Sequence, residues 1–284
     1  MGREENIIVF EDTMKLCKEN CRLKESVAKA LKNQKLVLEN SLIGNIEKEI
    51  YTEPAQIVVS KKRSYEAAVG YKGYKTCVHN FASATNPGGG VVKGSGAQEE
   101  CLCRCSDLYL CLNSGEAWDS FYLPHREAHN PLHNDDIIYT PDVVVFKSDT
   151  AYPELLPEEE WYEVNVITCA APNIRSCPGN AYNVGDGSEP AMITEEELFG
   201  MHVKRLRRIL DVAALNENEV VILGAFGCGA FANNPEVVAK AAREVLPEYL
   251  RAFKVVEFAV YCSPRDEENY RVFERVMCEL ENGG

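Results

Sequence analysis

The sequence lacks any run of apolar residues approaching the ~18 that a membrane-spanning helix needs, and its first twenty residues lack the apolar core of a secretory signal. Positive charge is also scarce, because 30 Lys and Arg stand against 44 Asp and Glu, a formal charge of −14. A chain this acidic repels polyanions at long range, so we expect no membrane partner and no broad nucleic-acid-binding face. We predict a cytoplasmic protein in which any anionic ligand is held locally, largely by backbone N–H groups.

Metal-binding patterns of cysteine are missing as well. The chain has 12 cysteines, but the spacing of Cys101, Cys103, Cys105 and Cys111 matches no standard zinc site. Without an export signal, the expected state is reduced, buried thiols. With 284 residues, 45% of them apolar, the chain is long enough to bury a sizeable core and has an ordinary globular composition.

Local patterns predict alternating strands and helices from residue 56 onward. Continuous Val/Ile runs predict buried strands over 56–60, 76–82, 143–146, 164–171, 220–226 and 254–262. Helices are expected over 10–43, 64–70 with Ser64 as its cap, 99–113, 195–214 with Thr194 as its cap, from 235 onward, and over 267–281. Residues 115–136 are expected to be irregular and 172–193 to form a long loop. This alternation predicts a three-layer α/β/α domain over 55–284, preceded by an N-terminal helical extension over 1–54.

The segment with the most chemical content runs from Asn80 to Glu100. Gly88, Gly89 and Gly90 remove three Cβ atoms in succession, which allows positive φ and close approach of the backbone to a ligand. Successive N–H groups of such a loop can form an anion-binding nest. Glu99 and Glu100 then open a helix, where carboxylates either cap the N-terminus or carry out acid/base chemistry. Adjacent helical residues point ~100° apart, so only one of the two can face a scissile bond.

A second glycine-rich segment, Gly224–Phe231, follows another predicted strand. Ligands of α/β sheets bind at the carboxyl ends of strands. We therefore expect both glycine loops on the same edge of the sheet.

The triple glycine, seven intervening residues and Gln98-Glu99-Glu100 resemble the signature of poly(ADP-ribose) glycohydrolases, which are macrodomains. The likeness is greatest to the bacterial-type (microbial) branch. Three further segments, Leu102–Tyr109, Cys169–Asn173 and Gly224–Phe231, follow in the same order, so the resemblance spans roughly residues 56–280. It implies a macrodomain-like mixed sheet.

The resemblance also implies an activity and a set of site residues. Glu100 would be the general acid and base that cleaves a ribose–ribose O-glycosidic bond, and Glu99 would position the ribose. The 227–231 loop would clamp the diphosphate, Phe231 would pack on the terminal ribose, and 171–173 would lie towards the adenosine. Exo-cleavage would release ADP-ribose without a metal or other cofactor. The implied substrate contacts are Asn86, Gly88, Gly89, Gly90, Val91, Gln98, Ala171, Pro172, Asn173, Gly227, Cys228, Gly229, Ala230 and Phe231.

Other functions stay open at this stage. The same loops suit a non-catalytic ADP-ribose-binding macrodomain, or a mono-ADP-ribosyl hydrolase acting on a modified protein or nucleic acid. His125, His129 and His133 have helical spacing and would suit a metal-dependent hydrolase, but Pro124 and Pro131 favour surface-loop histidines. Residues 227–232 match the dinucleotide pattern G-x-G-x-x-A, yet the acidic residue expected after the next strand is absent. The basic run 61–63 is expected to be a solvated strand end.

Overall fold

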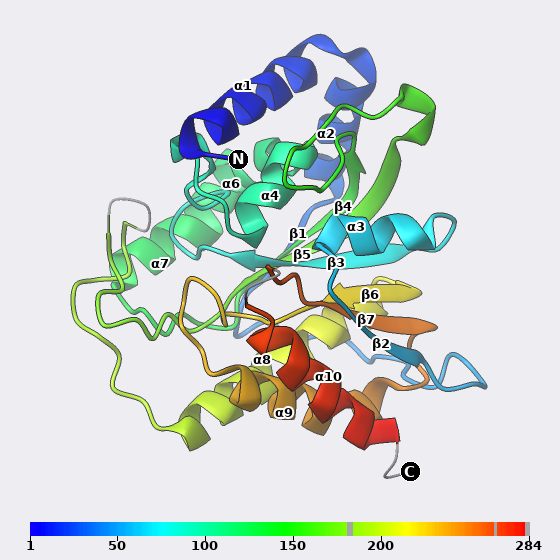
Figure 1. Cartoon of the computed structure of the whole chain (residues 1–284), viewed down its shortest axis with the longest axis vertical. Helices are drawn as coiled ribbons and strands as arrows, with labels where there is room; N and C mark the ends of the chain where they lie inside the picture. The colour runs from blue at the N-terminus through cyan, green and yellow to red at the C-terminus, as the bar shows by residue number, and fades with distance from the viewer. Residues whose placement is uncertain (181–183, 264–265, 282–284) are drawn as a thin grey trace.

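The computed structural model of the chain describes residues 1–180, 184–263 and 266–281. Its centre is a seven-stranded mixed sheet with the order β1-β4-β5-β3-β6-β7-β2 (Figure 1). Strand β4 (Ile137–Val145) runs antiparallel to both β1 and β5. The remaining neighbours are parallel, and the other strands are β1 (Lys35–Val37), β2 (Gln56–Ser60), β3 (Thr76–Ala82), β5 (Tyr162–Ala170), β6 (Val220–Leu223) and β7 (Val255–Ala259).

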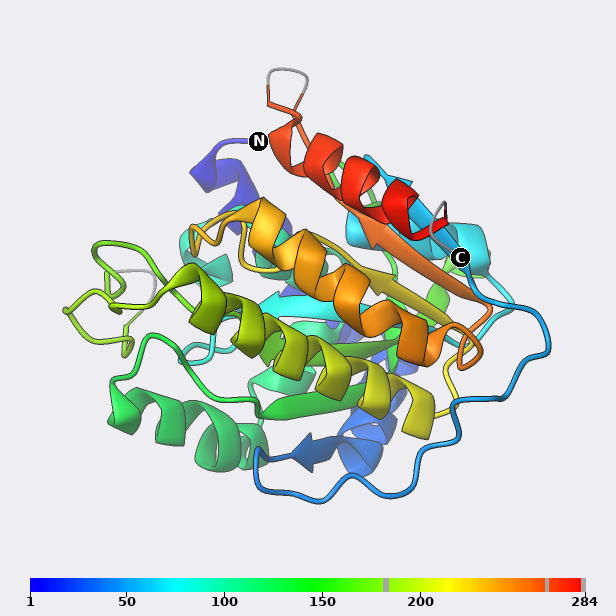
Figure 2. The same cartoon turned by 90° about the horizontal axis from the view of Figure 1, so that it is seen from below.

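Helices cover both faces of this sheet. Helices α8 (Glu195–Leu215), α9 (Pro235–Val245) and α10 (Glu268–Glu281) lie side by side on one face (Figure 2). The other face carries α2 (Cys21–Asn33), which packs on β4, and α3 (Ser64–Ala68), α4 (Gln98–Cys105), α5 (Leu108–Leu112), α6 (Gly115–Ala117) and α7 (Leu123–Ala128), with α1 (Arg3–Glu19) packed against α2 and α4. The predicted three-layer architecture is confirmed. Among the described residues, no helix is both long and apolar enough to cross a membrane.

Successive residues of the central strands pack into opposite layers. Cys77 and Val221 belong to the core under α8 and α9, whereas Val78 and Ile222 belong to the core under α4. This is why the strands have no polar face and read as continuous apolar runs. The four cysteines at 101, 103, 105 and 111 are buried, as predicted.

The N-terminal region differs from the single helix predicted over 10–43. It forms α1 and α2, separated at Asn20, whose side chain accepts a hydrogen bond from Leu23 N at 3.2 Å and so caps α2. Residues 35–37 then form β1, which pairs with the first residues of β4. The division of the chain near residue 54 stays a prediction.

Three other local predictions are wrong. Arg63, rather than Ser64, is the N-cap of α3. The helix predicted over 99–113 is broken between α4 and α5, because Ser106 bridges to β4 and the Asp107 carboxylate accepts from Val144 N at 2.9 Å. The segment 115–128 is helical, with Pro124 in the first turn of α7, where a helix does not need its N–H.

Candidate functional site

The loops that follow β3, β5 and β6 meet at the carboxyl edge of the parallel strands. Two cavities lie there. The first, which we name the carboxylate cavity, has a volume of about 480 Å³ and is lined by Glu99, Glu100, Gly89, Gly90 and the N-terminus of α1. The second, the apolar cavity, has a volume of about 330 Å³ and extends towards β7 and α10. The lining residues that the two cavities share are Phe81, Gly96, Ala97, Ala230 and Phe231.

Glu100 is buried in the first turn of α4, facing the carboxylate cavity. Its Oε1 accepts a hydrogen bond from Gly90 N at 2.8 Å. Its Oε2 is also buried but has no hydrogen-bond partner in the part of the chain that the structure describes. Burial raises the pKa of the Glu100 carboxyl. An oriented, buried carboxyl with one oxygen left unpaired is suited to carry and transfer a proton.

Glu99 is held differently. Its Oε2 accepts from Ser83 N at 2.8 Å, and its Oε1 accepts from the Asn80 amide at 3.3 Å. Burial raises the pKa of Glu99 well above its usual value, and the neighbouring charge of Glu100 adds to this effect. Both oxygens are tied to the end of β3, so Glu99 has a fixed orientation.

Gly89 explains why the loop has no side chain beside these carboxylates. It has a φ of +60°, and a Cβ there would lie 2.6 Å from Glu100 Oε1 and 3.0 Å from Glu99 Oε2. Only glycine fits without displacing the two carboxylates.

Residues 88–91 of the triple-glycine loop do not form an open anion nest in this structure, and their contact with a substrate stays a prediction. Their N–H groups already have protein acceptors: the Glu99 carboxylate for Gly88, Asn86 O for Gly89, Glu100 Oε1 for Gly90 and Gly88 O for Val91. Two of these N–H groups donate to the carboxylates, and the other two donate to backbone carbonyls of the same loop.

The second glycine loop presents free donors. Within the described residues, the N–H groups of Gly229, Ala230 and Phe231 have no protein acceptor. Its carbonyls are held instead by the buried Asn233 amide, which donates to Gly227 O at 3.1 Å and to Phe231 O at 3.2 Å. Three neighbouring unpaired N–H groups are suited to bind an anion.

Asn233 also links this loop to the segment that follows β5. The same amide donates to Pro172 O at 2.7 Å, and its oxygen accepts from His202 Nε2, also at 2.7 Å. Burial lowers the pKa of His202 to about 4, so the imidazole is neutral near pH 7. Cys228, in the same loop, has a pKa raised by burial to about 12, so its thiol is not ionised.

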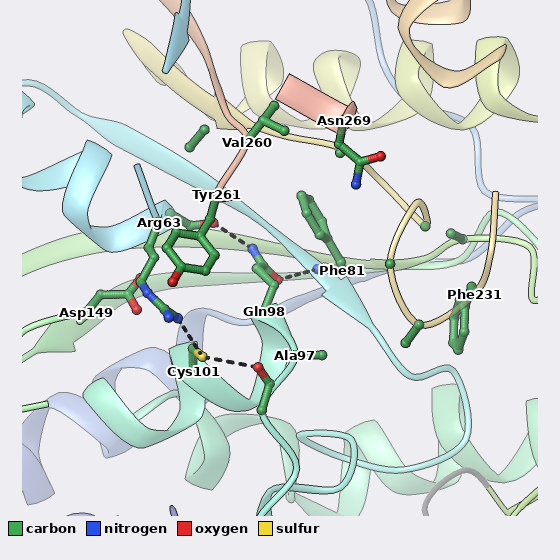
Figure 3. Close-up of a pocket in the computed structure, with 18 residues that line it drawn as sticks. Arg63, Phe81, Ala97, Gln98, Cys101, Asp149, Phe231, Val260, Tyr261 and Asn269 are labelled. Atoms are coloured by element: carbon green, nitrogen blue, oxygen red, sulfur yellow. Dashed lines mark hydrogen bonds between the residues drawn. The ribbon is translucent and has the colours of Figure 1, made fainter. Parts of the chain in front are cut away.

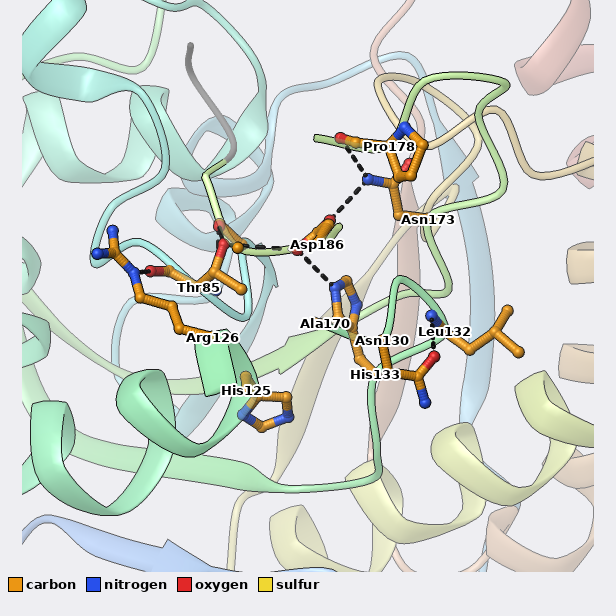
Figure 4. A network of polar contacts seen from close by, with 12 residues as sticks. Thr85, His125, Arg126, Asn130, Leu132, His133, Ala170, Asn173, Pro178 and Asp186 are labelled. Carbon is orange, nitrogen blue, oxygen red and sulfur yellow. Dashed lines mark hydrogen bonds and ion pairs between the residues drawn. The ribbon is translucent and has the colours of Figure 1, made fainter. Parts of the chain in front are cut away.

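A network of polar contacts lies behind the segment that follows β5 (Figure 4). Asn173 donates to Asp186 Oδ2 at 2.7 Å. His133 contacts Ala171 O through Nδ1 at 2.8 Å, and its Nε2 lies 3.1 Å from Asp186 Oδ1. Arg126 donates to Thr85 O at 2.6 Å. Thr85 Oγ1 donates to Asp186 Oδ1 at 3.5 Å, so the network ties the loop after β5 to the start of the first glycine loop.

Gln98 has a side-chain amide that is fully engaged. It accepts from Phe81 N at 2.9 Å and donates to Ser64 Oγ at 2.9 Å and His79 O at 2.8 Å (Figure 3). It joins β3, α3 and α4 at the wall of the apolar cavity.

The predicted contact residues divide into three groups. Gly89, Gly90, Glu99, Glu100, Ala230 and Phe231 line the carboxylate cavity. Gln98, Ala171, Gly227 and Gly229 line the apolar cavity, as do Ala230 and Phe231. Asn86, Gly88, Val91, Pro172, Asn173 and Cys228 line neither cavity.

The far end of the apolar cavity holds residues that were not predicted to belong to the site (Figure 3). The Arg63 guanidinium lies 4.0 Å from the centre of the Tyr261 ring and donates to Cys101 Sγ at 3.3 Å. Asp149 is buried beside it, and burial raises its pKa to about 6. The prediction of a solvated strand end is therefore wrong for Arg63, because the side chain turns into the cavity wall.

Helix α1 and Arg175 also line the carboxylate cavity. Asn6 donates to Gly94 O at 3.0 Å, and a Cβ at Gly94 would collide with the backbone of Arg3. No local pattern in the first 50 residues indicates this long-range contact. One sequence feature could have indicated Arg175 as a site residue. It lies two residues after Asn173, beyond the carboxyl end of a buried strand.

The histidine segment does not form surface loops throughout. His125 and His133 are buried, because His125 contacts Phe121 O at 2.7 Å and Asn134 Oδ1 at 2.8 Å, and His133 joins the network described above. Among the described residues, no group of three His, Cys, Asp or Glu side chains is placed to hold a metal ion.

Comparison with known proteins gives a consistent result. Residues 5–148 match the model of the family described as microbial-type PARG, catalytic domain, where PARG is poly(ADP-ribose) glycohydrolase. The structure of a poly(ADP-ribose) glycohydrolase from Thermomonospora curvata is similar, with a TM-score of 0.82 and 28% identity over 96% of this chain and 99% of that one. A search of curated proteins gave no match.

A second solved structure is that of the poly(ADP-ribose) glycohydrolase of Deinococcus radiodurans in complex with ADP-ribose. It has a TM-score of 0.75 and 32% identity, over 89% of this chain and 98% of that one. The family match covers about half of the chain, and these structural matches cover nearly all of it. The chain therefore belongs to the microbial-type poly(ADP-ribose) glycohydrolase family.

Proposed function

We propose that this protein hydrolyses the ribose–ribose O-glycosidic bonds of poly(ADP-ribose) and releases ADP-ribose. The observation that carries the proposal is the geometry of Glu100. One of its oxygens is oriented by Gly90 N, and the other is buried and unpaired beside a cavity with free N–H donors at its rim.

Glu100 acts first as an acid and then as a base. Burial raises the pKa of Glu100 and so favours the protonated carboxyl, whose proton passes to the leaving ribose oxygen as the glycosidic bond breaks. The ribosyl group left behind is oxocarbenium-like. Water then attacks its anomeric carbon, and the Glu100 carboxylate takes the released proton, which restores the starting state. Glu99, held by Ser83 N and Asn80, orients a ribose hydroxyl.

The two cavities suit the two ends of ADP-ribose. The terminal ribose occupies the carboxylate cavity, against Gly89, Gly90 and Phe231. The diphosphate crosses the wall that the two cavities share, where Ala230 and Phe231 offer N–H groups, with that of Gly229 beside them in the apolar cavity. The adenosine occupies the apolar cavity, whose wall includes Phe81 and Tyr261. The D. radiodurans relative in complex with ADP-ribose, and a T. curvata relative bound to the inhibitor ADP-HPD, support this choice of ligand.

We further propose that cleavage proceeds from the end of the polymer. Met1, Arg3 and Asn6 line the carboxylate cavity, and the Asn6–Gly94 contact holds α1 against the first glycine loop. This wall supports enclosure of a terminal ribose, which would exclude a chain that continues past it.

The test is incubation of the protein with poly(ADP-ribose) in the presence of a chelator, with free ADP-ribose as the product measured. Release of ADP-ribose from the start of the reaction supports exo-hydrolysis without a metal. Binding of ADP-ribose without any product would identify a non-catalytic reader. Release only from a singly ADP-ribosylated protein or nucleic acid would identify a mono-ADP-ribosyl hydrolase and contradict the proposal.

A further inference from the structure

Arg175 is a cation inside the carboxylate cavity that the reaction described above does not use. It lies five residues beyond β5 and is half-buried. Its guanidinium is held on two sides, since Nε donates to Asn173 Oδ1 at 3.0 Å and Nη2 donates to Pro178 O at 2.7 Å. The guanidinium carbon lies 5.7 Å from the centre of the Phe231 ring. The side chain is therefore oriented before any ligand arrives.

The residue that holds Arg175 is itself fixed. Asn173 is fully buried, and its amide nitrogen is engaged by Asp186 at 2.7 Å and by Pro178 O at 3.2 Å (Figure 4). Its amide oxygen is thereby directed at the guanidinium of Arg175. Because Asp186 also contacts the buried His133, this anchor extends into the body of the protein.

Charge points to an anionic ligand for Arg175. In the described parts of the chain, no carboxylate lies within ion-pair distance of its guanidinium, and Nη1 has no hydrogen-bond acceptor. The chain has an excess of 14 negative charges, so counter-ions for an arginine are plentiful elsewhere on the protein. A guanidinium without an ion-pair partner offers its remaining donors to a phosphate or carboxylate of a ligand.

The position of Arg175 indicates which phosphate it meets. It lines the carboxylate cavity but neither the shared wall nor the apolar cavity. In the placement proposed above, the diphosphate and adenosine of the terminal unit lie along the shared wall and in the apolar cavity, which Arg175 does not line. The nearest anion on the other side of the scissile bond is a phosphate of the next unit of the polymer.

We propose that Arg175 binds a phosphate of the unit on the leaving side of the scissile bond, and so favours a polymer over a substrate with an uncharged leaving group. This inference rests on the proposed function. It makes Arg175 a specificity-determining residue for the polymer, positioned by Asn173 and Asp186.

The experiment measures kcat/KM of the wild type and of Arg175→Gln on two substrates. One is poly(ADP-ribose), and the other is an ADP-ribose 1″-O-glycoside whose leaving group is an uncharged alcohol. Loss of a hydrogen bond between charged groups lowers kcat/KM for the polymer by about tenfold to a hundredfold. The kcat/KM for the uncharged glycoside and the Kd for ADP-ribose stay at the wild-type values. Arg175→Lys, which keeps the charge, recovers part of the loss.

Arg208→Gln is the matched control. Arg208 is also half-buried and also donates to backbone carbonyls, of Asp135 and Val37, but it lies on α8 outside both cavities. We expect the Arg208 variant to keep the wild-type ratio of kcat/KM for the polymer to kcat/KM for the uncharged glycoside. If Arg175→Gln lowers kcat/KM equally on both substrates, or leaves it unchanged on the polymer, the inference is overturned. The proposed function survives that result as long as the wild type hydrolyses the polymer. A wild type that hydrolyses neither substrate would overturn the proposed function as well.

Discussion

The glycine loop after β3 and the glycine loop after β6 border the same cavities, but their N–H groups are used in opposite ways. Those of residues 88–91 are bonded within the protein, and two of them hold the carboxylates of Glu99 and Glu100. Those of Gly229, Ala230 and Phe231 are left unpaired among the described residues, while Asn233 holds the carbonyls of that loop.

This difference assigns separate tasks to the two loops. In the proposed function, the first loop positions the acid/base groups, so changes there should act on kcat. The second loop offers donors to a ligand, so changes there should act on Kd. Glycine-rich sequence alone does not distinguish the two, because the acceptors come from residues distant in sequence or from the ligand.

The largest effect is expected from Glu100→Gln. The amide oxygen still accepts from Gly90 N, but no acidic proton is available for the leaving oxygen. We expect kcat on poly(ADP-ribose) to fall by about a thousandfold or more. Steady-state release of ADP-ribose measures this. Residual activity within tenfold of the wild type would remove Glu100 from its assigned role.

Gly89→Ala should impair the function of the first loop and leave that of the second loop unchanged. The new Cβ would push against both carboxylates, and we expect kcat to fall about a hundredfold because a small misplacement of reacting groups is costly. Gly73→Ala is the matched control, since Gly73 also has a positive φ but a Cβ there meets no atom within 4 Å. If the control loses as much activity, backbone strain rather than carboxylate placement explains the result.

The pH dependences of kcat and of the Kd for ADP-ribose should also differ, because they report on different loops. Burial raises the pKa of Glu100, so the acid stays protonated to a higher pH than an exposed glutamate. Above that pKa, kcat should fall by about tenfold per pH unit, whereas the Kd for ADP-ribose should stay constant because the amides of the second loop do not titrate. Profiles of kcat and Kd over the same pH range test this. A Kd that follows the kcat profile would argue against separate tasks.

The smallest of these effects is expected from Asn233→Ala. The variant removes the side-chain amide that joins the carbonyls of Pro172, Gly227 and Phe231, although backbone N–H groups still donate to Gly227 O and Phe231 O. We expect binding of ADP-ribose to weaken by about tenfold, with little change in kcat at saturation. Asn165→Ala is the control, because Asn165 is also a buried asparagine that links two segments, through Asn218 and Asp142, away from both cavities. Equal weakening in both variants would indicate a general loss of stability.

Much of the fold could be predicted from local sequence. The strands at 56–60 and 76–82 and the Thr194 cap have the predicted bounds, because Val/Ile runs and capping boxes are local signals. Strand β1 and the break between α4 and α5 could not be predicted, because both depend on pairing with β4.

The candidate site shows the same limit. Glu99, Glu100 and both glycine loops could be found from their pattern, and the structure brings them to one edge of the sheet. The role of Asn233 as a clamp, the place of Arg175 and the wall made by α1 could not be found. Each depends on contacts between segments far apart in the sequence.

The most direct test of the two-task account is calorimetric titration of ADP-ribose into Glu100→Gln and Asn233→Ala, side by side with the wild type. The account predicts that the Glu100 variant binds with a Kd close to that of the wild type, while the Asn233 variant binds about tenfold more weakly. Weak binding by the Glu100 variant together with normal binding by the Asn233 variant would contradict the assignment of chemistry to one loop and binding to the other.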